Sequence, residues 1–97
     1  MQIRISDQAL NFFKEDMDLG SGDAVRFTSK VYGKTNIHEG VSVMVQVSQP
    51  QKILVSETID GITFFAEEDD AWFYNDHSLE VDYDEEEEKL LFTFVDD

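Results

Sequence analysis

The stretch from Thr58 to Tyr83 constrains the fold more than any other part of the chain, because three structural signals follow one another in it. Asp60 and Gly61 stand between two apolar runs, and both residue types tolerate the positive φ angles of a tight hairpin turn. Acidic residues then open a helical segment over residues 67–74, with negative charge where a helix N-terminus favours it. From residue 78 to 83 apolar side chains alternate with polar and acidic ones, which is typical of a half-buried strand. We therefore predict a hairpin, a short acidic helix and a strand, in that order.

An amphipathic helix is predicted near the N-terminus, after a short strand at residues 3–5. Ser6 is a suitable N-cap, because its hydroxyl can accept a hydrogen bond from the first turn. Leu10, Phe13 and Met17 share one face at helical spacing. Gly20 and Gly22 end the helix.

Alternation and turn residues predict the remaining strands, over residues 24–30, 41–47, 53–59, 62–65, 79–83 and 90–95. The acidic turn Asp84–Glu88 joins the last two. About seven short strands in mixed sheets, one main N-terminal helix and a short acidic helix make the predicted fold mostly β with α decoration, of the α+β class.

This order of elements resembles the HesB/IscA-like family, the A-type iron-sulfur cluster carriers and their relatives. The residues that carry the resemblance are Ile59–Phe64, Leu79–Tyr83 and, at the N-terminus, Ile3–Ala9. Together they extend over most of the chain. The resemblance implies a single HesB-like domain over residues 1–97 and a role related to iron-sulfur cluster biosynthesis.

The cysteines on which that family's chemistry rests are missing from this sequence. Tyr32–Gly40 occupies the position of the family's cysteine loop, and Leu91–Asp97 stands where a C-terminal cysteine pair is expected. Because Cys thiolates are the usual ligands of iron-sulfur centres, no cluster is expected in the monomer. The resemblance therefore implies an accessory or partner-binding member of the small HesB-like branch, whose partners belong to the iron-sulfur assembly machinery.

Length and composition restrict the alternatives further. A chain of 97 residues with 41% hydrophobic side chains can form one globular core. It has no apolar run of about 18 residues to span a bilayer and no signal-peptide pattern. We expect a cytoplasmic protein that has no contact with a membrane.

The charge of the chain lies almost entirely in its C-terminal third. Residues 67–97 hold 14 acids and one base, Lys89, and the whole chain has a net charge of -15. Such a surface repels nucleic-acid phosphates and attracts cations or basic proteins. Glu85, Glu86, Glu87 and Glu88 are therefore candidate partner-binding residues, and a solvated turn that serves only solubility is the alternative.

Two histidines are the candidate metal ligands. His38, with Glu39 beside it, lies in the predicted loop near the position of the family's cysteine, and His77 is the only other imidazole. With a carboxylate they could bind a divalent metal, provided the fold brings them together. A solvated loop histidine is the alternative interpretation of His38. Asp82, Asp84 and Glu86 alternate as in a calcium loop, but the glycine and the closing glutamate of an EF-hand are missing.

No catalytic motif is present, so we predict that the protein is not an enzyme. Three hypotheses remain open: an accessory protein of iron-sulfur cluster biosynthesis, a divalent-metal-binding module built from His and carboxylates, and an acidic interaction protein. Trp72, Phe73 and Tyr74 form an aromatic cluster that suits either the core or a partner surface.

Overall fold

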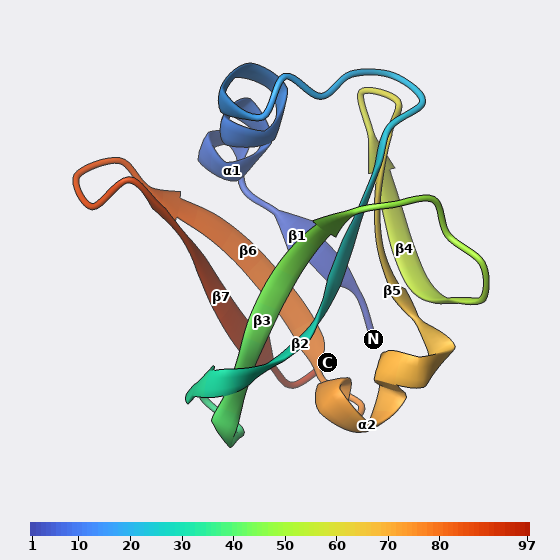
Figure 1. The fold of residues 1–97 in the computed structure, drawn as a ribbon, viewed down its shortest axis with the longest axis vertical. Coiled ribbons are helices and arrows are strands. Elements are labelled where there is room, and N and C mark those ends of the chain that lie inside the picture. The colour runs from blue at the N-terminus through green and yellow to red at the C-terminus, as the bar shows by residue number, and fades with distance from the viewer.

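The computed structural model describes residues 1–97 and confirms a mostly β fold with two mixed sheets (Figure 1). A three-stranded sheet has the order β1-β6-β7, formed by Ile3–Ile5, Ser78–Asp84 and Lys89–Val95. A four-stranded sheet has the order β3-β2-β5-β4, formed by Glu39–Val47, Ala24–Lys34, Ile62–Glu67 and Ile53–Ile59. The β1–β6 and β2–β5 pairs are parallel, and the other pairs are antiparallel.

The N-terminal helix begins as predicted but changes its winding. Ser6 caps α1 (Asp7–Asn11), since its hydroxyl oxygen accepts a hydrogen bond from the Ala9 N–H at 3.1 Å. From Phe12 to Asp16 the chain continues as a π-helical segment, which the regular helical spacing of apolar residues did not predict. Phe13 nevertheless reaches the core and is fully buried. None of the helices is long and apolar enough to cross a membrane.

Both sheets and both helices contribute to one hydrophobic cluster. Its largest members are aromatic and pack mainly edge to face, as aromatic rings prefer. They are Phe13, Phe27, Phe64, Phe73, Tyr74 and Phe94. The core therefore unites segments from almost the whole length of the chain.

The predicted turn at Asp60 and Gly61 joins β4 to β5. Both residues have positive φ angles, 53° and 80°, as a primed two-residue hairpin turn requires. The Gly61 carbonyl oxygen accepts a hydrogen bond from the Gly22 N–H at 3.0 Å. A Cβ atom on Gly61 would lie 2.4 Å from the Ser21 hydroxyl oxygen, so this position has room only for glycine.

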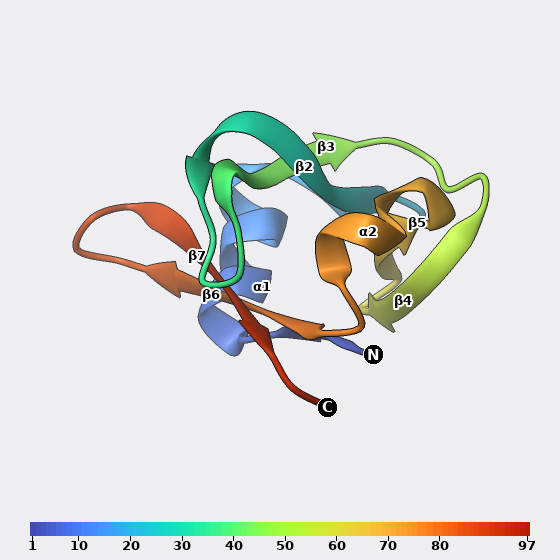
Figure 2. The same ribbon diagram turned by 90° about the horizontal axis from the view of Figure 1, so that it is seen from below.

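The β2–β3 hairpin is longer than predicted. The segment Tyr32–Gly40 was expected to be a loop, but β2 continues to Lys34 and β3 begins at Glu39, which leaves only residues 35–38 outside the strands. The pairing register shifts between Val31 and Lys34. This irregularity bends the hairpin, and its end folds over toward β7 (Figure 2). The prediction was wrong here because residues 31–34 are all exposed and do not show the alternation of a half-buried strand.

The acidic helical segment is also confirmed. It consists of a 3₁₀ turn, Glu68–Asp70, followed by α2, Ala71–Tyr74. Asp70 is buried and holds the segment against β2, accepting two hydrogen bonds of 3.1 Å from Arg26 and one of 2.6 Å from Thr28. The hydrogen bond to Asp70 raises the pKa of Arg26. Sequence patterns gave no signal of this contact, because its partners are more than 40 residues apart.

Candidate functional site

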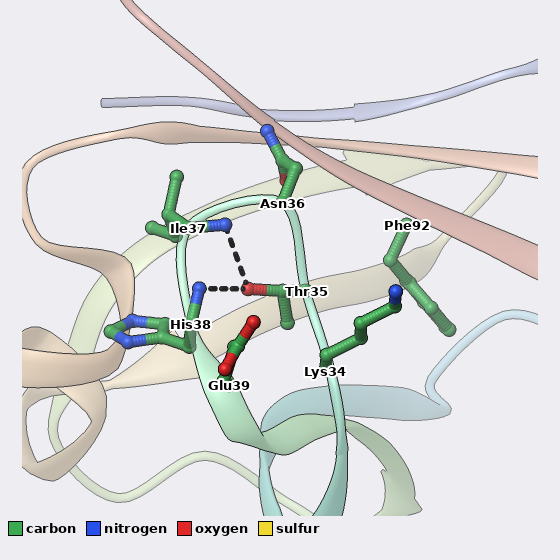
Figure 3. Close-up of a pocket in the computed structure, with 7 residues that line it drawn as sticks. All are labelled: Lys34, Thr35, Asn36, Ile37, His38, Glu39 and Phe92. Atoms are coloured by element: carbon green, nitrogen blue, oxygen red, sulfur yellow. Dashed lines mark hydrogen bonds between the residues drawn. The ribbon is translucent and has the colours of Figure 1, made fainter.

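The loop between β2 and β3 has a defined structure at the end of the folded-over hairpin (Figure 3). The Thr35 hydroxyl oxygen accepts hydrogen bonds from the N–H groups of Ile37 and His38, at 3.2 and 3.0 Å. The Thr35 N–H donates to the His38 carbonyl oxygen at 2.9 Å. A threonine at the first position of the loop therefore stabilises its turn.

Asn36 attaches this loop to the other sheet. Its side-chain nitrogen donates to the Phe94 carbonyl oxygen at 2.6 Å, and its side-chain oxygen accepts from the Phe94 N–H at 2.8 Å. The amide thereby pairs with β7 as the backbone of a neighbouring strand would. The two sheets are joined at this point, and the bend of the hairpin is held in place.

His38 is half-buried and turns away from the loop toward α2 (Figure 3). Its Nε2 atom lies 2.7 Å from the Phe73 carbonyl oxygen, and because a carbonyl only accepts, Nε2 carries the proton. The imidazole stacks on the Phe73 ring with centroids 5.3 Å apart. His38 therefore takes part in packing, unlike the solvated loop histidine that was considered.

His77 follows the C-terminal end of α2. Its Nδ1 atom is 2.8 Å from the Asn75 carbonyl oxygen, and its Nε2 atom is 3.3 Å from a carboxylate oxygen of Asp96. His38, Glu39 and His77 are not assembled, and no group of three or more His, Asp or Glu side chains is suitably placed for a metal ion. The condition that these residues form one group of ligands is not fulfilled, and each histidine ring is instead hydrogen-bonded to a backbone carbonyl near the C-terminal end of α2, His38 to Phe73 and His77 to Asn75.

A hollow of about 600 Å³ lies beside the loop, lined by Lys34 to Glu39 and by Phe92 of β7. Only two of its seven lining residues, Ile37 and Phe92, are hydrophobic. Small-molecule sites are mostly apolar with a few polar groups, so this hollow has a different character. It is a surface feature of the joined sheets.

The predicted acidic turn at Glu85–Glu88 is confirmed as the connection of β6 to β7. Asp84 organises it, because its carboxylate accepts hydrogen bonds from the N–H groups of Glu86 and Glu87 at 3.0 and 3.2 Å. All four glutamates are exposed, and the turn projects beyond the rest of the molecule in both views (Figure 1, Figure 2). A role for these residues in binding a partner stays a prediction.

The predicted aromatic cluster of α2 divides between core and surface. Phe73 and Tyr74 are fully buried, and the Tyr74 hydroxyl donates to the Phe27 carbonyl oxygen at 2.9 Å. Burial raises the pKa of Tyr74, which stays protonated at physiological pH. Trp72 is 58% exposed and contacts His38 edge to face, with centroids 5.9 Å apart.

The bend of the β2–β3 hairpin is the most exposed apolar point of the chain, and sequence reasoning missed it. We use the term hairpin corner for residues Lys30, Val31, Tyr32, Gly33 and Lys34. Val31 is 73% exposed and Tyr32 is 80% exposed. Tyr32 has a φ of 131°, an angle that L-residues other than glycine rarely adopt. The glycine that follows Tyr32 was the only signal of this bend in the sequence.

The charge around the hairpin corner is opposite to that of the rest of the chain. Residues 24–56 hold four bases and a single acid, Glu39, a net charge of +3, whereas the remaining residues hold three bases and 21 acids. Arg26 is neutralised by Asp70. Lys30 and Lys34 form no ion pair. Unpaired cations and exposed apolar side chains thus meet on one hairpin.

The chain resembles several bacterial proteins over nearly its whole length. It is 42% identical over 94 residues to a Bacillus subtilis (strain 168) protein named pyruvate dehydrogenase inhibitor, covering 97% of this chain and 99% of the relative. It is 29% identical over 85 residues to an uncharacterized protein of Staphylococcus saprophyticus, covering 84% of this chain and 87% of the relative. An uncharacterized protein of Staphylococcus haemolyticus is 26% identical over 92 residues. No protein-family model matches the chain.

The fold is that of a small, mostly β protein, and the relative that shares 42% of its residues is named as an inhibitor, which agrees with the prediction that the chain is not an enzyme. The chain belongs to the family of the Bacillus subtilis pyruvate dehydrogenase inhibitor.

The HesB/IscA-like assignment, with its role in iron-sulfur cluster biosynthesis, is therefore wrong. The relative that shares 42% of its residues with this chain carries the name of an enzyme inhibitor, and nothing among the comparisons indicates the HesB/IscA family. The assignment failed because a hairpin, a short helix and an alternating strand specify only an arrangement of elements. Function depends on the residues placed on that arrangement. The missing cysteines were the part of the sequence that bore on function.

Proposed function

We propose that this chain inhibits pyruvate dehydrogenase by binding to it as a folded protein. The observation that carries the proposal is the 42% identity to the Bacillus subtilis inhibitor, which extends over 97% of this chain and 99% of the relative. An alignment of that extent leaves no large segment in which the two proteins could differ in architecture. A cytoplasmic location, expected from the sequence, remains a prediction.

Inhibition by surface contact agrees with the character of the site. The chain offers a polar hollow and exposed apolar and basic side chains, and such features suit a protein partner better than a small molecule. We propose further that the chain needs no metal or cofactor for this action. The protonated Nε2 of His38 already donates to a carbonyl, which supports the proposal.

The test is a titration of the purified chain into purified pyruvate dehydrogenase from the same organism. We expect the pyruvate-dependent rate to fall to a saturable limit, and calorimetry to give a dissociation constant that matches the half-inhibiting concentration. An unrelated dehydrogenase assayed in parallel should keep its rate. Addition of a chelator should leave inhibition unchanged if no metal takes part. An unchanged rate with the folded chain in large molar excess would overturn the proposed function.

A further inference from the structure

We propose that the hairpin corner, Lys30–Lys34, is the surface through which this chain contacts its target enzyme. The site it fits is an apolar recess that receives the Tyr32 ring and is flanked by carboxylates that meet Lys30 and Lys34. This inference rests on the proposed function, because the enzyme is the partner that the function supplies.

The backbone of Tyr32 is the first observation. A φ of 131° costs a non-glycine residue about 1–3 kcal/mol, and such strain is found mainly where function maintains it. Glycine could take this angle without strain, and the next residue is in fact Gly33, with a φ of 77°. Tyr32 is 80% exposed, so its burial contributes little to the stability of the fold. A tyrosine at this position therefore stabilises the fold little.

Ser42 provides a second, independent observation at the same bend. It pairs with Lys30 across the β2–β3 hairpin, and its hydroxyl lies under Gly33, where a Cβ atom would come within 3.1 Å of the oxygen. That oxygen is the one buried side-chain polar atom of the chain without a hydrogen-bond partner. An unsatisfied buried hydroxyl is unfavourable by about 1–3 kcal/mol. Two unfavourable local features therefore coincide at the hairpin corner.

The chemistry of the hairpin corner suits a binding hot spot. Tyrosine is enriched among the residues that dominate interface energies, and it presents a large contact area with few rotatable bonds. Val31 adds a neighbouring apolar contact. Lys30 and Lys34, which form no ion pair, flank Tyr32 in the sequence. Asn36 holds the bend against β7, so little conformational entropy remains to be lost on binding.

The charge distribution indicates which side faces the enzyme. Carboxylates beside the proposed recess would repel the 21 acids outside residues 24–56 and attract Lys30 and Lys34. The approach that brings Tyr32 and its lysines first is therefore the favoured one. The acidic turn at Glu85–Glu88 would point elsewhere.

The experiment compares inhibition and calorimetric binding for wild type and matched variants. Tyr32→Gly should weaken binding about 30-fold, the loss typical of a hot spot, while thermal unfolding is unchanged or shifted upward because strain is relieved. The double variant Lys30→Glu/Lys34→Glu should weaken binding at least about tenfold. Lys52→Glu, the same charge change at an exposed lysine without an ion pair, and Trp72→Ala, the other strongly exposed aromatic, should stay within about twofold.

The two proposals fail in different ways. If the wild-type chain neither binds nor inhibits the enzyme, the proposed function is overturned and this inference falls with it. If the wild type inhibits and the Tyr32→Gly and double-lysine variants inhibit equally well, only the hairpin corner is overturned. Loss of inhibition in Trp72→Ala alone would move the contact to α2 and would also contradict the inference.

Discussion

Of the bends that adopt positive φ angles, the β4–β5 turn and the hairpin corner do so for different reasons. At the β4–β5 turn, Asp60 and Gly61 are residue types that suit these angles, and Gly61 fits against Ser21 where no side chain could be placed. At the hairpin corner, the positive angle falls on Tyr32, a residue type that does not suit it. Asp60 also forms an ion pair with Lys14, at 3.0 Å, whereas the lysines of the hairpin corner form none.

The difference separates a structural device from a functional one. At the β4–β5 turn the residue types suit the backbone angles, and the packing against Ser21 requires Gly61. At the hairpin corner, strain, exposure and an unsatisfied hydroxyl all act against stability, and each persists. Because the fold does not require these residues, we expect them to contact a partner.

Gly61→Val should cause the largest loss of stability, because it changes the residue that the β4–β5 turn requires. The variant places a branched side chain at a φ of 80° and a Cβ atom 2.9 Å from the backbone Cα of Ser21. We expect a loss of about 2–4 kcal/mol in the free energy of unfolding, measured by urea titration. Gly20→Ala is the matched control, since its new methyl group would meet nothing within 4 Å. Equal stability of the two variants would show that the β4–β5 turn is not fixed by packing.

The two bends also differ in how far the sequence could predict them. The β4–β5 turn depends on adjacent residues, so Asp60-Gly61 between apolar runs was sufficient. Beyond the hairpin corner, Asn36 is hydrogen-bonded to Phe94, 58 residues away, and no local pattern contains that contact. The buried Asp70 and its partner Arg26, 44 residues apart, escaped prediction for the same reason. Strand periodicity predicted the elements, and only long-range contacts decided how they bend.

The candidate site was harder to predict than the fold. The sequence predicted histidines and acids as site residues because their side chains can bind metals or basic partners. In the structure, however, His38 and His77 are hydrogen-bonded to backbone carbonyl oxygens around α2. The exposed Tyr32 carries no motif, because its strain becomes visible only from the backbone angle. A surface that acts by shape and charge leaves little trace in residue types alone.

Asn36→Ala is the next largest change, and it tests what holds the hairpin corner in place. The variant leaves the N–H and carbonyl of Phe94 without their side-chain partner, so we expect a loss of about 1–2 kcal/mol in unfolding free energy. Hydrogen exchange of the Phe94 amide should become faster. Thr93→Ala, at the exposed neighbouring position, should be close to neutral. If the Asn36 variant keeps the Phe94 amide protected, the bend is maintained by something other than this contact.

Glu67→Gln addresses the far end of the β4–β5 hairpin, with a smaller and pH-dependent effect. The Glu67 carboxylate accepts hydrogen bonds from the N–H groups of Gln51 and Lys52, at 2.8 and 2.7 Å, and these bonds lower its pKa. A carboxylate with a lowered folded-state pKa stabilises the fold above its unfolded-state pKa, and this stabilisation is lost as the pH falls through the folded-state value.

The variant should therefore melt at a slightly lower temperature than wild type at neutral pH, and the difference should shrink in acid, as followed by circular dichroism. Glu68→Gln, an exposed neighbour that accepts none of these hydrogen bonds, is the control. A difference that is constant from neutral pH to about pH 3 would show that the charge of Glu67 contributes nothing.

Replacing Glu85, Glu86, Glu87 and Glu88 together by Gln should have the smallest effect of all. This third hairpin turn has a positive φ at Glu88, 54°, but it lies outside the core, and Asp84 rather than the glutamates accepts its backbone hydrogen bonds. Removing four adjacent negative charges relieves mutual repulsion, so the melting temperature should stay constant or rise slightly at low salt. The only ion pair lost joins Lys89 to Glu87 at 3.4 Å on the surface, where such pairs contribute little.

The same fourfold variant separates the acidic turn from the hairpin corner as a contact surface. If the enzyme meets Tyr32 and its flanking lysines, removing the charges of the turn leaves that contact intact, and inhibition should stay within about twofold of wild type. A drop beyond about tenfold, with unchanged melting, would make the glutamates the binding residues and would assign a basic surface to the enzyme. The strained tyrosine would then lack a functional reason. Because the two outcomes require opposite charges on the enzyme, a single titration of this variant beside Lys30→Glu/Lys34→Glu distinguishes them.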